Sequence, residues 1–541
     1  MLQYECLTSP RRILVSEGGI LKLRPDVQVR IVRKEAPGPA VALQDRVNAI
    51  RDRMQQRMQT KQGWTKEEEA LRGWVWRDGL VQPHESLNNA IDQLSESDRK
   101  LYDWTVKAWT QVNSGSGVGL DVRSPQEKMA AQSAEPGPMP DAPTSGAKTK
   151  QALLGRRLRL EQGRRSPLCK QVTKAILAYK HQQEQILQSA RAPLFLEHYL
   201  PHTELTGSLP DRLLALASAA LLAVASKRAF LVDWQAPMPI DLLFDSAIGI
   251  DWSYPFVPDA EKAHPIFGDE STTIQRKEVG SPGLTKAEID AALPEVEWTD
   301  YDIKWLRLLL DRDAVFRTFD YSSIGSALLT LGFKQETALH CAVSSFLAPK
   351  SATLAFASRY AALLLNPSVF SVGIQIRTRG PDEPFPPPES AVSASAYRGF
   401  FKCAAQMAQK HAVAAQKIVY YLVSDSDTVN AVALEEFKDN VLLSSFEAMA
   451  VDSSMDDVKP FEHDKQKHTM NAAMDQVAEL WTLASSDFQV VTKGSAFGKL
   501  AAMLTGIEGR TVALAAGTAE ENVDCSVDNA FTSFETMSMQ W

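Results

Sequence analysis

Apolar and polar positions follow a regular order along the last third of the chain. Apolar runs of four to eight residues, such as VFSVGIQI at 369–376 and KIVYYLVS at 417–424, are separated by segments with apolar residues at helical spacing. This alternation is typical of a parallel sheet covered by helices on both faces. It predicts an α/β lobe over residues 367–541, with further strands at 440–445, 488–492 and 511–516.

Residues 191–366 show the same alternation of apolar runs and helical segments, but less regularly, and predict a second α/β lobe. GSLPDRLLALASAALLAVAS predicts a turn followed by a helix, and KRAFLVDW predicts a short strand. The apolar stretch at 213–225 has 13 residues, too few to cross a bilayer, so we interpret it as a buried helix. Further helices are expected at 302–316 and 352–365.

The first 190 residues are divided by composition into three segments. Residues 1–112 predict a helical N-terminal extension, with helices at 41–60 and 85–111. Residues 113–150 are rich in Ser, Gly, Ala and Pro and predict a disordered linker. Residues 151–190 predict a basic helical stem, whose arginines form a solvated face or a contact with a membrane surface or partner.

The charge is unevenly distributed. Residues 1–190 hold 30 Lys and Arg against 21 Asp and Glu, whereas the remaining residues hold 28 against 45 and bring the net charge to −8. An acidic body argues against a general nucleic-acid surface. The five cysteines show no metal-site spacing, and their odd number fits either a reducing compartment or a secreted protein with at most two disulfides. The start of the chain lacks the apolar core of a signal peptide.

Polar residues follow three of the predicted strands of the C-terminal lobe. Arg377 follows the strand at 369–376, Asp425 follows the strand at 417–424, and Gly494 and Ser495 follow the strand at 488–492. Ligands of parallel α/β sheets bind beyond the carboxyl ends of the strands. These residues are therefore candidates for one binding site.

Their chemistry suits a nucleoside diphosphate. A helix N-terminus binds phosphate, Gly494 allows the backbone to approach it, and Arg377 can hold two phosphate oxygens. Asp425 can accept a hydrogen bond from a ribose hydroxyl or a base edge. Alternatively, Asp425 and Ser495 are ordinary helix caps and Arg377 is a surface residue. No P-loop or GxGxxG fingerprint occurs, which disfavours a P-loop ATPase or a nicotinamide dehydrogenase.

The same residues carry a family resemblance. VGIQIR, YLVSDS and AELWTLASSDFQVVTKGSAFGKLAAMLTG resemble, in order, motifs of the inverting GDP-fucose-dependent fucosyltransferases, most closely the plant xyloglucan type. LTGSLPDRLLALASAALLAVASKRAFLVDW resembles the glycine loop, helix and strand of the family's first lobe. The resemblance covers about residues 200–516. It implies a GT-B fold with two Rossmann-like lobes and a metal-independent enzyme without a cofactor.

The resemblance also implies roles for individual residues. Arg377 matches the catalytic arginine that grips the donor β-phosphate, and Glu479 matches the acidic residue that hydrogen-bonds guanine. The other implied donor-binding positions are Gly207, Arg212, Asp425, Gly494, Ser495, Phe497 and Gly498. In the GSLPDR loop, Pro210 departs from the family pattern and removes a backbone donor.

No catalytic base stands out. An inverting transfer usually needs a group that takes the proton of the acceptor hydroxyl. Asp382 and Glu383 are candidates because they follow Arg377 closely, and His198 and His202 are candidates on an expected loop, where a plain surface histidine is the simpler interpretation. The resemblance also leaves room for a dissociative route with no base.

We therefore expect an enzyme that transfers fucose from GDP-fucose to a glycan hydroxyl with inversion. The alternatives are an inactive relative that binds nucleotide or glycan, and a transferase that uses another nucleotide sugar. The expected partners are a GDP-sugar and an oligo- or polysaccharide, without nucleic acid. The resemblance implies a Golgi enzyme of glycan or cell-wall biosynthesis if a membrane anchor precedes this sequence, and a cytoplasmic protein otherwise.

Overall fold

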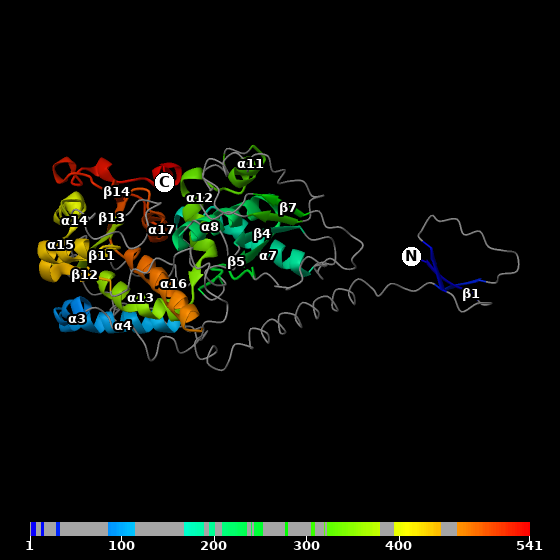
Figure 1. Cartoon of the computed structure of the whole chain (residues 1–541), viewed down its shortest axis with the longest axis horizontal. Helices are drawn as coiled ribbons and strands as arrows, with labels where there is room; N and C mark the ends of the chain where they lie inside the picture. Colours follow the sequence, from blue (N-terminus) through cyan, green and yellow to red (C-terminus); the bar gives the residue numbers. More distant parts are fainter. Residues whose placement is uncertain are drawn as a thin grey trace, which may run out of the picture.

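The fold, seen in a computed structural model, is built on two parallel β-sheets (Figure 1). The structure describes residues 2–6, 12–15, 29–32, 85–113, 167–188, 194–200, 208–234, 240, 243–252, 276–279, 305–308, 319, 322–378, 394–444 and 463–540. Each sheet is flanked by helices, so the predicted α/β fold with two lobes is confirmed.

The C-terminal sheet has the strand order β12-β11-β10-β13-β14, and all neighbouring strands are parallel. Every residue of the central strand β10 is buried, as expected for a strand covered on both faces. The five predicted strands are all present: β10 (Val369–Ile376), β11 (Lys417–Ser424), β12 (Val441–Leu443), β13 (Phe488–Thr492) and β14 (Thr511–Leu514).

The alternation of side chains along β10 divides the core between the two faces of this sheet. Phe370, Val372 and Ile374 pack in one apolar cluster with residues of α14 (Arg398–His411) and α15 (Asp427–Phe437). The opposite face is covered by α13 (Ser351–Leu364), α16 (His463–Leu483) and α17 (Ala496–Thr505).

The sheet of the first lobe has the strand order β5-β4-β8-β7, again with parallel neighbours. Its strands are β4 (Phe195–Leu200), β5 (Ala229–Trp234), β7 (Arg276–Val279) and β8 (Trp305–Leu308). The expectation of a helix from 302 is wrong at 305–308, where β8 pairs with both β4 and β7. The expectation of His198 on a surface loop is also wrong, because His198 lies in β4 and is fully buried. His202 lies outside the described residues.

Helix α8 (Leu209–Ser226) forms the core of the first lobe. Ser208 and Asp211 form a reciprocal capping box at its N-terminus. Pro210 lies in the first turn, where its missing N–H would have no intrahelical acceptor. By length and composition α8 could cross a membrane, but it is 94% buried within the protein, which confirms the interpretation of a buried helix.

The lobes pack against each other through α8, α12 (Gln335–Phe346) and α17. In α12, the His340 Nδ1–H donates to the Met503 carbonyl oxygen of α17 at 2.5 Å. The His340 ring also stacks on Phe534 of α18 (Phe534–Gln540), with centroids 5.5 Å apart. The last helix therefore returns from the C-terminal sheet to the first lobe.

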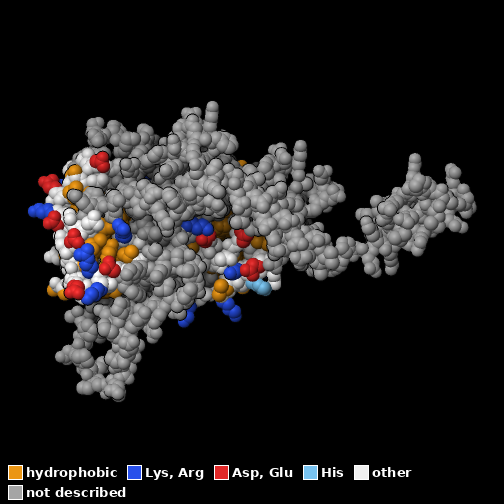
Figure 2. Space-filling model, turned by 90° about the horizontal axis from the view of Figure 1, so that it is seen from below, with side chains coloured by type: hydrophobic (Ala, Val, Ile, Leu, Met, Phe, Trp, Pro, Cys, Tyr) orange, Lys and Arg blue, Asp and Glu red, His pale blue; other side chains and the backbone are white. Residues whose placement is uncertain are grey.

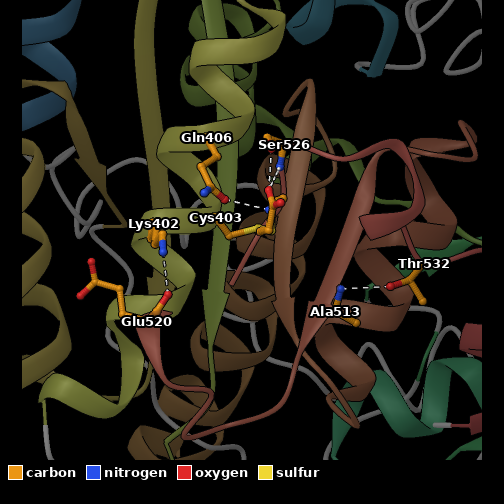
Figure 3. Close-up of a disulfide and its surroundings, with 9 residues drawn as sticks. Lys402, Cys403, Gln406, Ala513, Glu520, Ser526 and Thr532 are labelled. Atoms are coloured by element: carbon orange, nitrogen blue, oxygen red, sulfur yellow. Dashed lines mark hydrogen bonds between the residues drawn. A yellow bond between two sulfur atoms is a disulfide. The ribbon is translucent and has the colours of Figure 1, made fainter. Parts of the chain in front are cut away.

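Two disulfides are present, as the secreted alternative allowed. Cys169 before α7 (Thr173–Gln188) is bonded to Cys341 of α12. Cys403 of α14 is bonded to Cys525, in the segment that follows β14 (Figure 3). Beside this second bridge, the Gln406 side chain accepts from the Cys525 N–H at 2.7 Å. The C-terminal segment is thus attached to α14 covalently and by hydrogen bonds.

Helices α3 (Glu85–Asp92) and α4 (Glu96–Asn113) of the N-terminal extension pack on the C-terminal lobe (Figure 1). The Ser86 hydroxyl oxygen accepts from the Leu443 N–H at 3.4 Å, at the outer strand β12. Asn366, which precedes β10, donates to the Asp98 carbonyl oxygen at 3.1 Å. These helices thereby cover part of the sheet edge.

The predicted subdivision of the first 190 residues is described only in part. Three antiparallel strands, β1 (Leu2–Cys6), β2 (Arg12–Val15) and β3 (Val29–Val32), occur within the segment predicted to be helical. The expected helix at 41–60 and the linker at 113–150, apart from residue 113, lie outside the described residues.

On the face seen in Figure 2, described acidic and basic side chains lie interspersed with apolar ones.

Candidate functional site

The three central strands of the C-terminal sheet end at the same level. Ile376 pairs with Ser424 of β11, and Gln375 pairs with Val491 of β13. Arg377, Asp425 and the turn that leads into α17 therefore follow adjacent strands at one edge of the sheet. The structure brings these predicted residues together.

Hydrogen bonds to β13 fix the backbone at Arg377. The Arg377 N–H donates to the Thr492 hydroxyl oxygen at 2.9 Å, and this hydroxyl donates to the Gln375 carbonyl oxygen at 3.2 Å. The Gln375 side-chain oxygen accepts from the Thr492 N–H at 3.2 Å. The backbone that carries the half-buried Arg377 side chain is thus fixed to the sheet by hydrogen bonds.

Asp425 is bonded to the residue after Arg377. Its Oδ1 accepts from both the N–H and the hydroxyl of Thr378, each at 2.9 Å. The N-cap of α15 is Ser426, whose hydroxyl accepts from the Val429 N–H. The alternative that Asp425 is the helix cap is therefore wrong.

The turn before α17 combines a left-handed glycine with a helix cap. Gly494 has a φ of +83°, a conformation that favours glycine, and no atom lies within 4 Å of the position of a Cβ there. The Ser495 hydroxyl caps α17 by accepting from the Gly498 N–H at 3.3 Å. Ser495 thus has the capping role that the sequence left open.

Close packing of α17 on β13 requires Gly498. A Cβ at this position would lie 2.8 Å from Val491 Cβ and 3.0 Å from the Gln375 side-chain oxygen. Phe497 is partly buried against the large apolar core. These two residues therefore have packing roles that set the position of the helix start.

Glu479 of α16 is a buried carboxylate near the same edge, with 5% of its surface exposed. It accepts a hydrogen bond from the Ser444 hydroxyl, and Ser444 follows β12, the neighbour of β11. Burial raises the pKa of Glu479 to about 8, opposed by the Ser444 hydrogen bond and reinforced by the charge of Asp475. A buried ionisable group with a shifted pKa is a candidate for function.

The remaining predicted residues are either in the first lobe or outside the described residues. Arg212 is in the first turn of α8 in the first lobe and is 2% exposed; α8 packs against α17. Gly207, Asp382 and Glu383 lie outside the described residues. Among the residues that the structure describes, no group of three His, Cys, Asp or Glu side chains is arranged to hold a metal ion.

Four polar residues acquire a place in the site that sequence reasoning did not assign: Gln375, Thr378, Ser444 and Thr492. Each lies in the last two positions of a strand or within two residues after its end. That position was the available signal, but the hydrogen-bond partner depends on the strand order, which the sequence does not show.

Comparisons with known proteins give distant structural likenesses. No protein-family model matches the chain, and no curated protein matches it. A mutant of Arabidopsis thaliana FUT1 in complex with GDP aligns at 15% identity and a TM-score of 0.42, covering 73% of this chain and 84% of that chain.

Two structures of the NodZ α-1,6-fucosyltransferase also align. The form soaked with GDP-fucose has 15% identity and a TM-score of 0.34, covering 58% of this chain and 93% of that chain. The form co-crystallised with GDP has 14% identity and a TM-score of 0.35, covering 57% and 92%. The α/β class follows from the two parallel sheets themselves.

Proposed function

We propose that this protein is a glycosyltransferase that binds a GDP-sugar at the carboxyl edge of its C-terminal sheet. It transfers fucose from GDP-fucose to a glycan hydroxyl, with inversion and without a metal ion. The observation that carries the proposal is that Arg377, the start of α17 and the Ser444–Glu479 pair all lie at this edge.

The diphosphate would lie between Arg377 and α17. The N–H groups of Ala496 and Phe497 in the first turn have no intrahelical acceptor and carry the positive end of the helix dipole. A guanidinium forms two parallel hydrogen bonds with phosphate oxygens. Together these groups offset the negative charge that develops on the leaving diphosphate as the glycosidic bond breaks.

Guanine recognition is assigned to Glu479. An ionised carboxylate can accept from both the N1–H and the N2 amino group of guanine, whereas uracil offers a single ring N–H. One oxygen of Glu479 is already bonded to Ser444, which orients the carboxylate. A GDP-sugar is therefore favoured over a UDP-sugar.

In the transfer, the acceptor oxygen attacks the anomeric carbon of fucose on the face opposite GDP. The bond between that carbon and the β-phosphate oxygen breaks, and its electron pair leaves with GDP. The acceptor proton passes to a base or to solvent. Asp382 and Glu383 remain the proposed candidates for the base, whereas the buried position of His198 in β4 disfavours it.

An oxidising compartment is proposed as the location. Disulfides persist in the secretory pathway and are rare in the cytosol. The bridges Cys169–Cys341 and Cys403–Cys525 therefore support a luminal enzyme, such as a Golgi enzyme that acts on cell-wall or other glycans, over a cytoplasmic one.

The test is a transfer assay with the purified full chain. GDP-fucose is incubated with a panel of oligo- and polysaccharides, GDP release is measured, and the anomeric configuration of the product is determined by NMR. We expect acceptor-dependent GDP release and an inverted product. Arg377→Ala should abolish release, while Arg359→Ala, an exposed arginine on α13, should retain it.

The other outcomes separate the alternatives. Stabilisation by GDP in a thermal melt without transfer to any acceptor would indicate an inactive nucleotide-binding relative. Stabilisation by UDP but not GDP would indicate another nucleotide sugar. Absence of both stabilisation and transfer would contradict the proposal.

A further inference from the structure

Thr378, the residue after Arg377, is held by three separate hydrogen bonds. Its N–H and its hydroxyl both donate to Asp425 Oδ1 at 2.9 Å. Its carbonyl oxygen accepts from the hydroxyl of Tyr397, a residue that is 6% exposed, at 3.2 Å. Thr378 lies beyond the last residue of β10, yet its backbone N–H, its backbone carbonyl and its hydroxyl are all hydrogen-bonded.

The Arg377 backbone is hydrogen-bonded on the opposite side of β10, to β13. Its N–H donates to the Thr492 hydroxyl of β13, whereas Asp425 lies just after β11. The two peptide N–H groups that flank the Arg377 side chain are therefore bound to residues at the ends of the two strands on either side of β10. This arrangement determines where the Arg377 Cα lies and in which direction its side chain leaves the sheet.

We propose that Asp425 is a positioning residue for Arg377 and that it acts on the bound diphosphate through the Thr378 backbone, not as a ligand of the ribose or the base. The inference rests on the proposed function, because it assumes that Arg377 binds the β-phosphate of a GDP-sugar. It replaces the direct nucleotide contact that the sequence suggested for Asp425.

The physical reason lies in the geometry of a bidentate contact. Two parallel hydrogen bonds from a guanidinium need the right distance and orientation together, and a shift of about 1 Å at a reacting centre lowers rates by about 100-fold. An arginine on a freely moving strand end would lose this orientation. A carboxylate that accepts two hydrogen bonds from one residue prevents such movement, because charge-assisted hydrogen bonds are stronger than neutral ones.

The two roles of Asp425 predict different ligand dependence. If Asp425 positions Arg377, its loss weakens only the binding of ligands that carry a β-phosphate. If Asp425 contacts the ribose or the base, its loss weakens GDP and GMP alike. GMP contains the same base and ribose as GDP and lacks only the β-phosphate, so the pair of ligands separates the two roles.

The experiment is a calorimetric titration of the full chain with GDP and with GMP. For Asp425→Ala we expect about tenfold weaker GDP binding and unchanged GMP binding. Asp425→Asn should retain most of the GDP affinity, because its amide oxygen is still an acceptor. Asp427→Ala, an exposed aspartate two residues along, is the matched control and should bind both ligands as the wild type does.

A double-mutant cycle tests the route through Arg377. In the Arg377→Ala background, Asp425→Ala should cause no further loss of GDP affinity, because the group that it positions is gone. Equal weakening of GDP and GMP, or additive losses in the cycle, would overturn the inference while leaving the proposed function intact. A wild-type chain that does not bind GDP would instead overturn the proposed function, and this inference with it.

Discussion

The Ser444 hydroxyl donates a hydrogen bond to Glu479, and this contact connects the end of β12 with a buried carboxylate of α16. Ser444 orients the carboxylate, but its hydrogen bond does not offset the effect of burial, since the pKa of Glu479 is still raised to about 8. The folded protein therefore holds Glu479 mainly protonated at neutral pH, and two consequences of this can be measured.

The first consequence is a pH-dependent stability. Between about pH 4.5 and 8 the folded state binds a proton that the unfolded chain has released. This group therefore lowers the wild-type free energy of unfolding as pH rises, by up to about 1.4 kcal/mol per pH unit. Glu479→Gln should be more stable relative to the wild type at pH 8 than at pH 5, as measured by urea unfolding.

Glu436→Gln on α15 is the control, because Glu436 is exposed. Its stability difference from the wild type should stay constant over the same pH range. The same constancy for Glu479→Gln would show that Glu479 has no raised pKa.

The second consequence concerns GDP binding. Guanine needs the ionised carboxylate, so binding below about pH 8 should release a proton from Glu479. We expect the GDP affinity to rise between pH 6 and 8 by up to about tenfold per pH unit. Titrations in buffers of different ionisation enthalpy measure the proton release; a wild type that takes up protons on binding GDP would contradict this role.

The disulfide between Cys403 and Cys525 should stabilise the C-terminal lobe and the attached segment. The double variant Cys403→Ser with Cys525→Ser should lose about 2–5 kcal/mol of unfolding free energy. Differential scanning calorimetry with and without a reducing agent checks this. In the reducing agent the difference should shrink, whereas a persistent difference would mean that the serines, not the missing bridge, destabilise the protein.

Docking of α3 on the C-terminal lobe predicts that the N-terminal extension contributes to stability. Leu87 of α3 is fully buried in the large apolar cluster, so Leu87→Ala should lower the unfolding free energy by about 2–5 kcal/mol. Leu177→Ala, at a leucine of α7 that is 52% exposed, should have a much smaller effect. Equal melting temperatures of the Leu87 variant and the wild type would show that α3 does not pack there in solution.

The C-terminal sheet was predictable because its strands are continuous apolar runs. β10, β11 and β13 have the predicted bounds, and parallel strands place their carboxyl ends at one edge whatever their order. The grouping of Arg377 with Asp425 and Ser495 follows from that rule. The partners of these residues do not, because Thr378 meets Asp425 only through the pairing of β10 with β11.

The first lobe was less predictable than the C-terminal one: β5 was expected, but β4, β7 and β8 contain charged residues that interrupt the apolar pattern. β4 contains Glu197 and His198 in the middle of FLEHYL, and these two polar residues led to the expectation of a loop. In the structure Arg307 of β8 makes a bidentate ion pair with Glu197, at 2.9 and 3.1 Å, so the charge is buried with its partner. The pair joins residues 110 positions apart, and no local pattern indicates it.

The disulfide pairing could not be predicted from the sequence either. The bonded cysteines are separated by 172 and 122 positions, so their spacing contained no signal for either bridge. The fold brings them together, and only then does the oxidised alternative gain support over the reducing one.

The central claim is that guanosine diphosphate binds at the carboxyl edge of the C-terminal sheet through Arg377. Calorimetric titration of the wild type and of Arg377→Ala with GDP and UDP tests this most directly. We predict GDP binding at one site per chain, weaker UDP binding, and at least about a tenfold loss of GDP affinity in the variant. An absence of GDP binding to the wild type, or equal GDP affinity of wild type and variant, would contradict the claim.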